Sequence, residues 1–480
     1  MAITAEGTIR SFRDPIGRVV FLDGRVFRFI SCPYKDVTLR FINSAFFVRN
    51  CEVGIFPVTH VLNEIPEGLL GLSEEYRPEC ILEHHRIHFP VYPHECSPRM
   101  LYNAGQLTLD LASEAISEGW LLKDATPWNV LFSNGRPVFA DVLSFEKKAA
   151  SLIWNAYAQF QRTFVLPLYA YDRHAWSVHA TFLDRRDGLD PCTLEPVIKG
   201  WRRWAPFEFQ TIVFPARLSQ RVRAASEIVN QIDENNQLAE FVLQRSFRRL
   251  RKQLSYVRPC TTKVSRWTNY ENDLQHYSDM DRESKFDFVR VSLLRISPSH
   301  VLDIGANTGE YSLLAATQGA NVVAADFDVA ALDKLFECVT QKKLPITPVV
   351  FNVSRPTPAI GWNNEEIESF LARARGQFQL IMALALVHHL LVTERVSLAF
   401  IVKLLFEFEA PYLLIEWVDP KDSRFREIAL THGNLYANLS DAIFELELER
   451  YFRIHERLQL RCKTRTLYLC ERLEQTKTDT

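Results

Sequence analysis

Hydrophobic and polar positions follow two different patterns along this chain, and the pattern changes near residue 300. From His300 onward, short apolar runs alternate with segments that have helical spacing. A buried strand followed by a helix, repeated several times, is typical of a parallel sheet covered on both faces. The expected strands are 301–304, 321–326, 347–351, 379–384 and 411–416, with helices at 309–318 and 329–339 after the first two.

The pattern before residue 300 is mixed. Residues 17–30 predict two short strands flanking Asp23-Gly24, a pair that permits the positive φ angles of a tight hairpin turn. Residues 100–120 have the spacing of an amphipathic helix, and 199–258 are helical and polar. We therefore expect an α+β domain at 1–198, a helical connector at 199–275, a Rossmann-like α/β domain at 276–474 and a flexible tail at 475–480.

Composition and charge narrow the class of protein. The chain has 480 residues, enough for two to four domains. Its charged fraction of 24% together with 12% aromatic residues excludes a mostly disordered protein. Lys and Arg number 56 against 58 Asp and Glu, a net charge of −2. This near balance argues against a nucleic-acid coat protein, so we expect no nucleic-acid partner.

Location and metal binding are inferred from what the chain lacks. The longest apolar stretch, 380–392, is far shorter than the ~20 residues of a membrane helix, and the first residues do not resemble a secretory signal. The nine cysteines include no C-x-x-C pair, so no zinc site is predicted and reduced thiols are expected. These features predict a cytoplasmic protein with no membrane partner and no metal.

The most informative segment is a glycine-bearing turn after the first strand of the C-terminal domain. Asp303 lies in that strand, and Gly305 and Gly309 let the turn approach a ligand closely. Asp326 ends the next strand. In dinucleotide-binding folds a carboxylate at this place accepts hydrogen bonds from the ribose hydroxyls. These residues predict a nucleotide-type ligand at the carboxyl ends of the strands.

The turn does not match a dinucleotide fingerprint. Asn307 and Glu310 stand where that fingerprint has its second and third glycines, so close approach to a pyrophosphate is disfavoured. A carboxylate at position 303 would also repel a pyrophosphate, whereas it could organise the amine of S-adenosylmethionine. The sequence therefore favours S-adenosylmethionine over NAD or FAD.

The segment resembles the class I S-adenosylmethionine-dependent methyltransferases, in Asp303, Gly305, Asn307, Gly309 and Asp326 and in the run 382–389 after the fourth strand. The resemblance implies that Asp303 and the glycine turn hold the methionine part and Asp326 the ribose. It further implies that Asn352 and Phe327 border the adenine. Asn307 departs from the frequent middle glycine of that family.

Three residues are candidates for helping the transfer itself. Methyl transfer is largely positioning, and a general base assists when the acceptor carries a proton. His388 and His389 follow the fourth strand, where family members often place acceptor-facing residues, and His389 is slightly preferred. Glu416 ends the fifth strand. The alternatives are that one histidine packs against the following helix and that Glu416 forms a structural salt bridge.

A second motif lies in the first half of the chain. Asp124, Asn129 and Asp141 have the spacing of the catalytic segment of kinase-like phosphotransferases. The usual histidine before Asp124 and glycine after Asp141 are absent, as are a glycine-rich phosphate loop and a strand lysine near 17–60. We therefore favour a kinase-like scaffold without phosphotransfer over an active kinase or a chance similarity.

The overall layout is similar to a bacterial family of paired-domain proteins that includes the rhizobial nodulation proteins of the NoeA type. That resemblance implies a small-molecule or saccharide-signal context. Two hypotheses follow from the residues and resemblances together. One is a methyltransferase that acts on an unknown small-molecule, saccharide or protein acceptor. The other is a non-catalytic binding or regulatory protein with a pseudokinase-like lobe and a nucleotide-binding domain.

Overall fold

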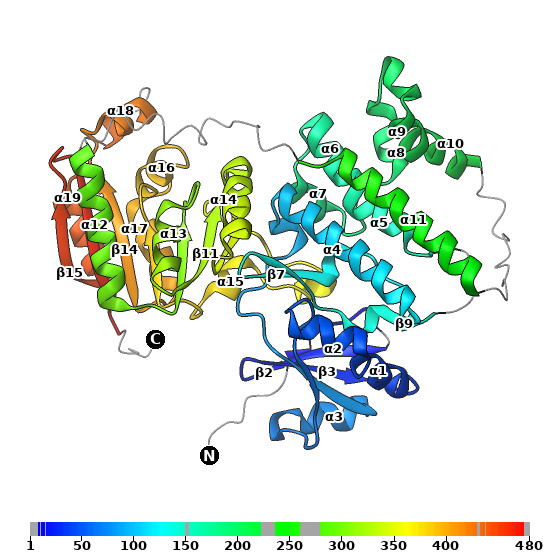
Figure 1. Ribbon diagram of the computed structural model, residues 1–480. Helices are drawn as coiled ribbons and strands as arrows, with labels where there is room; N and C mark the ends of the chain where they lie inside the picture. Colours follow the sequence, from blue (N-terminus) through cyan, green and yellow to red (C-terminus); the bar gives the residue numbers. More distant parts are fainter. Residues whose placement is uncertain are drawn as a thin grey trace. The chain divides into compact units, whose positions relative to one another are not determined.

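The computed structural model describes residues 8–9, 11–14, 16–148, 153–221, 236–259, 279–429, 433–436 and 438–474. The chain divides into two compact units (Figure 1). Unit 1 comprises 1–132, 137–260 and 360–367, and unit 2 comprises 133–136, 261–359 and 368–480. The expected tail, 475–480, lies outside the described residues.

Unit 2 is built on a seven-stranded sheet whose first five strands in chain order are parallel. Numbered within the unit, the strand order is 3-2-1-4-5-7-6, with the last two strands antiparallel to their neighbours. The order therefore switches direction between the first and fourth strands. The strands are β10 (His300–Ile304), β11 (Asn321–Asp326), β12 (Ile346–Val350), β13 (Leu380–Ala383), β14 (Tyr412–Val418), β15 (Phe452–Gln459) and β16 (Arg465–Arg472).

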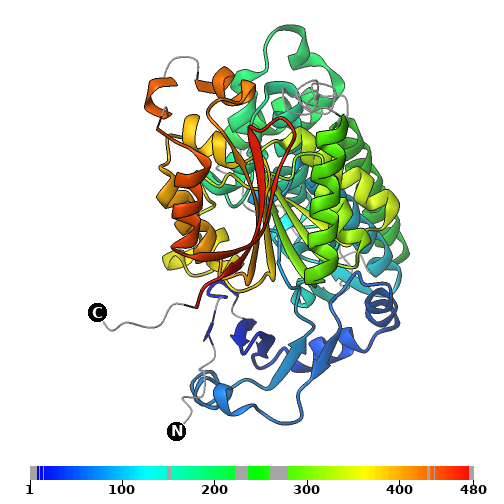
Figure 2. The ribbon, with the colours of Figure 1, turned by 90° about the vertical axis from the view of Figure 1, so that its left-hand side faces the viewer.

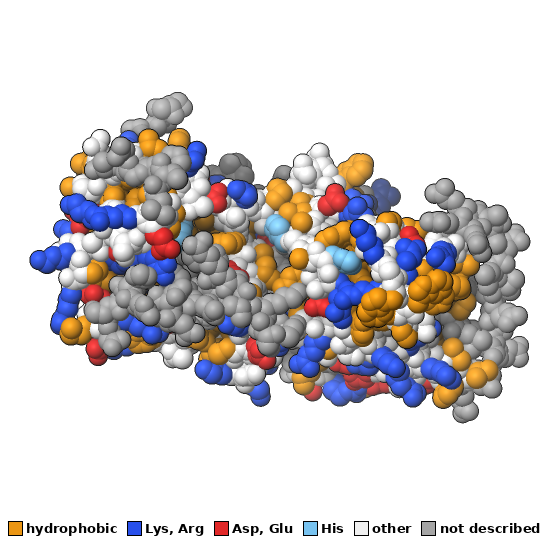
Figure 3. Space-filling view, turned by 90° about the horizontal axis from the view of Figure 1, so that it is seen from above, with side chains coloured by type: hydrophobic (Ala, Val, Ile, Leu, Met, Phe, Trp, Pro, Cys, Tyr) orange, Lys and Arg blue, Asp and Glu red, His pale blue; other side chains and the backbone are white. Residues whose placement is uncertain are grey.

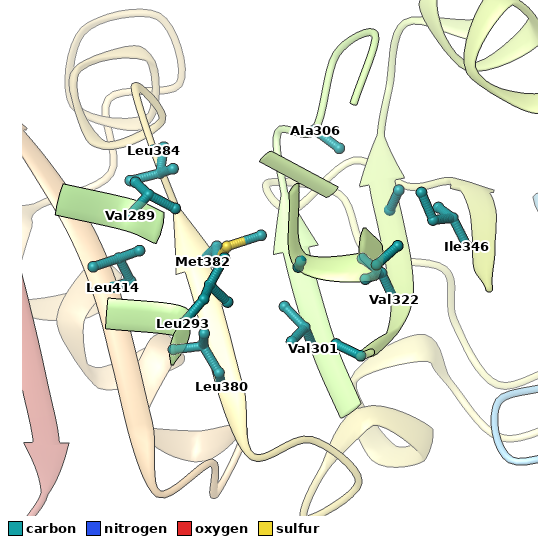
Figure 4. Close-up of a cluster of buried hydrophobic side chains, with 14 of the residues drawn as sticks. Val289, Leu293, Val301, Ala306, Val322, Ile346, Leu380, Met382, Leu384 and Leu414 are labelled. Carbon is teal, nitrogen blue, oxygen red and sulfur yellow. The ribbon is translucent and has the colours of Figure 1, made fainter. Parts of the chain in front are cut away.

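Helices cover both faces of this sheet, as Figure 2 shows. Apolar side chains of the sheet and of one helical layer share a core, in which Val289 and Leu293 lie near Met382 and Leu414 (Figure 4). The expected α/β fold is thus confirmed. The helices are α12 (Asp279–Ile296), α13 (Glu310–Thr317), α14 (Val329–Lys342), α15 (Phe370–Ala374), α16 (Val387–Val392), α17 (Leu398–Glu407), α18 (Ser423–Ala429) and α19 (Asp441–Glu449).

Unit 1 begins with a five-stranded antiparallel sheet in the order β1-β2-β3-β5-β4. The expected hairpin is present, because Asp23 and Gly24 adopt φ angles of 48° and 74° between β2 and β3. Two short two-stranded sheets follow: β7 pairs with β8, and β6 pairs with β9 across the segment that contains β7 and β8. The strands are β1 (Thr8–Ile9), β2 (Gly17–Leu22), β3 (Arg25–Ile30), β4 (Thr59–Val61), β5 (Cys80–His84), β6 (Trp120–Leu122), β7 (Val130–Ser133), β8 (Arg136–Phe139) and β9 (Phe145–Lys147).

The rest of unit 1 is helical, and its central helix is α4, which begins after an N-cap at Ser97. The helix α11 packs on α4, where its Leu254 approaches Gly105 and its Gln244 side chain exchanges hydrogen bonds with Ser113. The described part of the expected connector, 199–221 and 236–259, therefore belongs to unit 1. The longer helices are α1 (Lys35–Ile42), α2 (Ala45–Glu52), α3 (Leu70–Tyr76), α4 (Pro98–Ser117), α6 (Leu166–His174), α7 (Val178–Asp184), α10 (Phe214–Arg221) and α11 (Asn236–Tyr256).

Candidate functional site

A cavity in unit 2 lies at the carboxyl ends of β10, β11, β12 and β13. This is the switch point of the strand order, where open α/β sheets bind ligands. The strands that follow β10 in the chain, β11 and β12, lie on one side of it, and β13 and β14 lie on its other side. The loops after β10 and β13 therefore lead away from each other and form opposite walls of the cavity. Six of the seven residues predicted to hold a cofactor line this cavity: Asp303, Gly305, Asn307, Asp326, Phe327 and Asn352. Gly309, the seventh, is not among the lining residues.

The turn after β10 has the conformation that its glycines predict. Gly305 and Gly309 adopt φ angles of 81° and 87°, in the left-handed region that favours glycine. A Cβ atom on Gly309 would stand 2.5 Å from a methyl carbon of Leu335, so no larger residue fits there without displacement. Asn307 also adopts a left-handed φ of 51°, which asparagine tolerates better than most residues. The replacement of the middle glycine therefore preserves the turn.

Two buried carboxyl groups stand behind that turn. Asp303 accepts a hydrogen bond from the Ser312 hydroxyl at 2.6 Å, and burial raises the pKa of Asp303 to about 7. Asp326 accepts the backbone N–H groups of Asn307 at 2.7 Å and Asp328 at 2.8 Å. Burial raises the pKa of Asp326 to about 6 in spite of these donors. Each oxygen of Asp326 keeps a further lone pair that can accept a ligand hydroxyl.

The wall beyond Asp326 is suited to a flat apolar group. Phe327 is 56% exposed in the cavity wall, although phenylalanine is normally buried. Asn352 accepts hydrogen bonds from the backbone N–H and hydroxyl of Ser354, which fix the orientation of its amide. Phe351 also lines the cavity, and its ring stacks on Phe370 at a centroid distance of 3.8 Å.

Sequence reasoning missed two cations on α12 that line the cavity. Lys285 lies 5% exposed and donates to Glu416 at 2.7 Å, while Arg282 pairs with Glu310 at 2.8 Å. Their spacing of three residues on a helix was the available signal, since it places both on one face. Ala385, after β13, also lines the cavity and holds a strained φ of 55°.

The three predicted catalytic candidates lie in different surroundings. His389 lines the cavity. His388 is 1% exposed, neither of its ring nitrogens has a hydrogen-bond partner, and burial holds its pKa well below the usual value. Glu416 is fully buried and ion-paired with Lys285, and it is not among the lining residues. The geometry therefore separates His389 from the other two.

The motif of the first half forms a cluster within unit 1. The Asn129 side chain donates to the Asp124 carbonyl oxygen at 3.1 Å and to the Ser144 hydroxyl at 2.8 Å. Ser144 in turn donates to Asp141 at 2.5 Å. Arg28 of β3, which sequence reasoning missed, donates to the other Asp141 oxygen at 2.6 Å. Although burial opposes ionisation, the Arg28 guanidinium holds the pKa of Asp141 below its usual value.

This cluster predicts that magnesium-ATP will not stabilise the protein. Both oxygens of Asp141 already accept hydrogen bonds, and Arg28 supplies the positive charge that a metal ion would bring. We expect no change in the thermal midpoint when magnesium-ATP is added to the parent chain. A thermal shift that Asp141→Ala abolishes would contradict this and support an active phosphotransferase site.

No protein-family model matches the chain. The nodulation protein NoeA of Rhizobium meliloti (strain 1021) is 26% identical over 475 residues, which cover 97% of this chain and 96% of NoeA. The chain is thus similar to a NoeA-type nodulation protein over nearly its whole length. The expected resemblance is confirmed.

Solved structures give weaker likenesses. The bifunctional kinase-methyltransferase WbdD is 17% identical with a TM-score of 0.30, over 40% of each chain. The N-methyltransferase NodS from Bradyrhizobium japonicum WM9 is 15% identical with a TM-score of 0.30, over 41% of this chain and 97% of NodS. At these TM-scores neither likeness supports an inference about this chain.

Proposed function

We propose that unit 2 binds S-adenosylmethionine and transfers its methyl group to an acceptor. The observation that carries the proposal is the cavity at the strand switch point, which combines the glycine turn with Asp303 and Asp326. Bound S-adenosylmethionine supplies an electrophilic methyl group on a sulfonium. In this proposal Asp303 binds the methionine ammonium, Asp326 the ribose hydroxyls, and Phe327 with Asn352 the adenine.

The two cations of α12 extend the assignment. The methionine part of the cofactor carries a carboxylate beside its ammonium, and Lys285 and Arg282 line the same cavity as Asp303. A carboxylate is best held by a cation with hydrogen-bond donors. We assign Arg282 and Lys285 to this carboxylate, and the buried Asp303 to the ammonium. The alternating charges of the wall then complement the zwitterionic end of the cofactor.

The proposed base is His389, because it faces the cavity and histidine titrates near neutral pH. His388 and Glu416 do not line the cavity, so we propose that neither of them contacts the acceptor. Within the described ranges no group of three or more His, Cys, Asp or Glu side chains is placed to hold a metal ion. Unit 1 is proposed to be a kinase-like scaffold, supported by the pairing of Arg28 with Asp141.

The test uses methyl-labelled S-adenosylmethionine and extracts of cells that contain acceptors. We expect label to pass to a discrete species, with release of S-adenosylhomocysteine. His389→Asn is expected to lower the transfer rate about 10²-fold or more while calorimetric cofactor binding is retained. Asp326→Ala is expected to remove binding and transfer together. Cofactor binding without transfer in any extract would favour the alternative, a non-catalytic binding protein.

A further inference from the structure

An apolar and basic surface on unit 1 is independent of the cavity in unit 2. It comprises Trp201 and Trp204 of the 3₁₀ helix η7 (Gly200–Trp204), Phe214 and Leu218 of α10, and the cations Lys199, Arg202 and Arg217. We call it the tryptophan–arginine surface. Its four apolar side chains are between 47% and 76% exposed, far more than such side chains usually are. Figure 3 shows hydrophobic and basic side chains side by side on this face.

Two of the exposed rings, those of Trp204 and Phe214, are held in place by contacts with Phe209. The Trp204 ring stacks on Phe209 at a centroid distance of 5.9 Å, and Phe209 contacts Phe214 at 6.1 Å. Ile212 and Ala216 anchor the same segment because both are buried. Arg203 is held by Glu195 and donates to the Ile198 carbonyl oxygen at 3.2 Å. The fold therefore keeps these rings outside the core.

The local charge differs from that of the whole chain. Between positions 199 and 218 every exposed charged side chain is positive, namely Lys199, Arg202 and Arg217. The acid in this stretch, Glu208, is 2% exposed and accepts from the Tyr169 hydroxyl at 3.3 Å. The net charge of the chain is −2. This surface is thus a basic region on a nearly neutral protein.

We propose that the tryptophan–arginine surface docks on the surface of an anionic lipid bilayer. Tryptophan prefers the membrane–water interface, and arginines beside it gain from anionic headgroups. A nucleic acid is less suited, because a base needs a free ring face. Trp204 has Phe209 stacked on it and Arg217 at 6.0 Å, and Trp201 has Arg202 over its ring at 6.0 Å. Phe214 and Leu218 add apolar area that suits acyl chains.

The proposal concerns attachment at one surface only. No helix among the described residues is long and apolar enough to cross a membrane. The proposal departs from the expectation of no membrane partner, which rested on the absence of a spanning segment. It does not depend on methyl transfer, since the surface lies in unit 1 and the cavity in unit 2.

The experiment is flotation of the full chain with vesicles of phosphatidylcholine, with and without phosphatidylglycerol. We expect the parent chain to float with the anionic vesicles only, and less as salt is raised. Arg202→Glu with Arg217→Glu is expected to lower the partition coefficient by at least about 25-fold, roughly fivefold for each arginine lost. Trp201→Ala with Trp204→Ala is expected to lower it by at least about tenfold, from the lost apolar area.

Matched controls separate this surface from general charge and exposure. Arg245→Glu with Arg248→Glu makes the same charge change on exposed residues of α11, and Trp362→Ala removes a tryptophan that is 64% exposed. Both controls are expected to float like the parent. The proposal is overturned if the parent does not bind the vesicles, or if controls and surface variants lose vesicle binding equally. It is also overturned if the surface variants keep vesicle binding and instead lose oligonucleotide binding or self-association.

Discussion

Replacing Asp303 by asparagine is expected to weaken S-adenosylmethionine binding by roughly 30-fold to several thousandfold without destabilising the protein. The range corresponds to removing one partner of a buried, hydrogen-bonded charge pair, about 2–5 kcal/mol. The folded protein tolerates the change because asparagine keeps an oxygen for the Ser312 hydroxyl and adds no charge. Calorimetric titration gives the affinity, and thermal unfolding of the ligand-free chain gives the stability.

The pH dependence supplies a second signature. Burial raises the pKa of Asp303 to about 7, above its ordinary value, so the folded protein binds the proton more tightly than the unfolded chain. The contribution of Asp303 to the free energy of unfolding therefore falls as pH rises from about 4 to about 7. Cofactor affinity has the opposite slope, because the ammonium requires the ionised carboxylate. We expect affinity to rise about tenfold from pH 6 to pH 8, with proton release on binding at pH 6.

The control for both measurements is Asp287→Asn. Asp287 makes an exposed pair with Arg290 on α12, so the same substitution there is expected to leave affinity and its pH dependence unchanged. If Asp303→Asn binds the cofactor like the parent, Asp303 does not hold the methionine ammonium. If the variant unfolds, Asp303→Ser provides a second neutral side chain with which to separate binding from folding.

The parallel half of the unit 2 sheet could be predicted because each of its strands is buried on both faces. Such strands are continuous apolar runs, and β11 agrees with its expected range, Asn321–Asp326. The antiparallel pair was missed, although β15 alternates between buried and more exposed positions. The helix α12 was missed for another reason. Its buried positions include Asp281, Lys285 and Ser292, so its apolar residues do not form one stripe.

The parts of the site that could be predicted are those in which a residue and its neighbours in the sequence determine the backbone conformation. Gly305, Asn307 and Gly309 are local, and Asp326 follows from the place where its strand ends. The choice between His388 and His389 depended on how α16 packs, because adjacent helical residues point about 100° apart. Arg28 could not be paired with Asp141 from the sequence, since 113 positions separate them.

Glu416 was a catalytic candidate, and its surroundings suggest a different role. Its carboxylate accepts from Lys285 at 2.7 Å, with Arg465 at 3.6 Å. Arg465 also donates two hydrogen bonds to Asp422, at 3.0 and 3.2 Å. The positive charges of Lys285 and Arg465 thus neutralise the negative charges of Glu416 and Asp422 in the interior of unit 2. This network connects α12, which carries two cavity residues, to β14 and β16.

Glu416→Gln is accordingly expected to destabilise unit 2 by about 3–5 kcal/mol, because it leaves an uncompensated buried cation. Hydrogen exchange of peptides from β14 and β16, measured by mass spectrometry, reports unit 2 by itself. In those peptides the slowest amides are expected to exchange roughly 150-fold to several thousandfold faster.

Glu447→Gln is the control, since Glu447 pairs with the exposed Arg450 and its loss is expected to cost at most about 1 kcal/mol. Lys285→Met combined with Glu416→Leu removes both charges and is expected to recover much of the lost stability. That double variant is still expected to bind S-adenosylmethionine weakly, because it lacks the Lys285 ammonium. Normal exchange in Glu416→Gln together with lost methyl transfer would instead make Glu416 a catalytic residue.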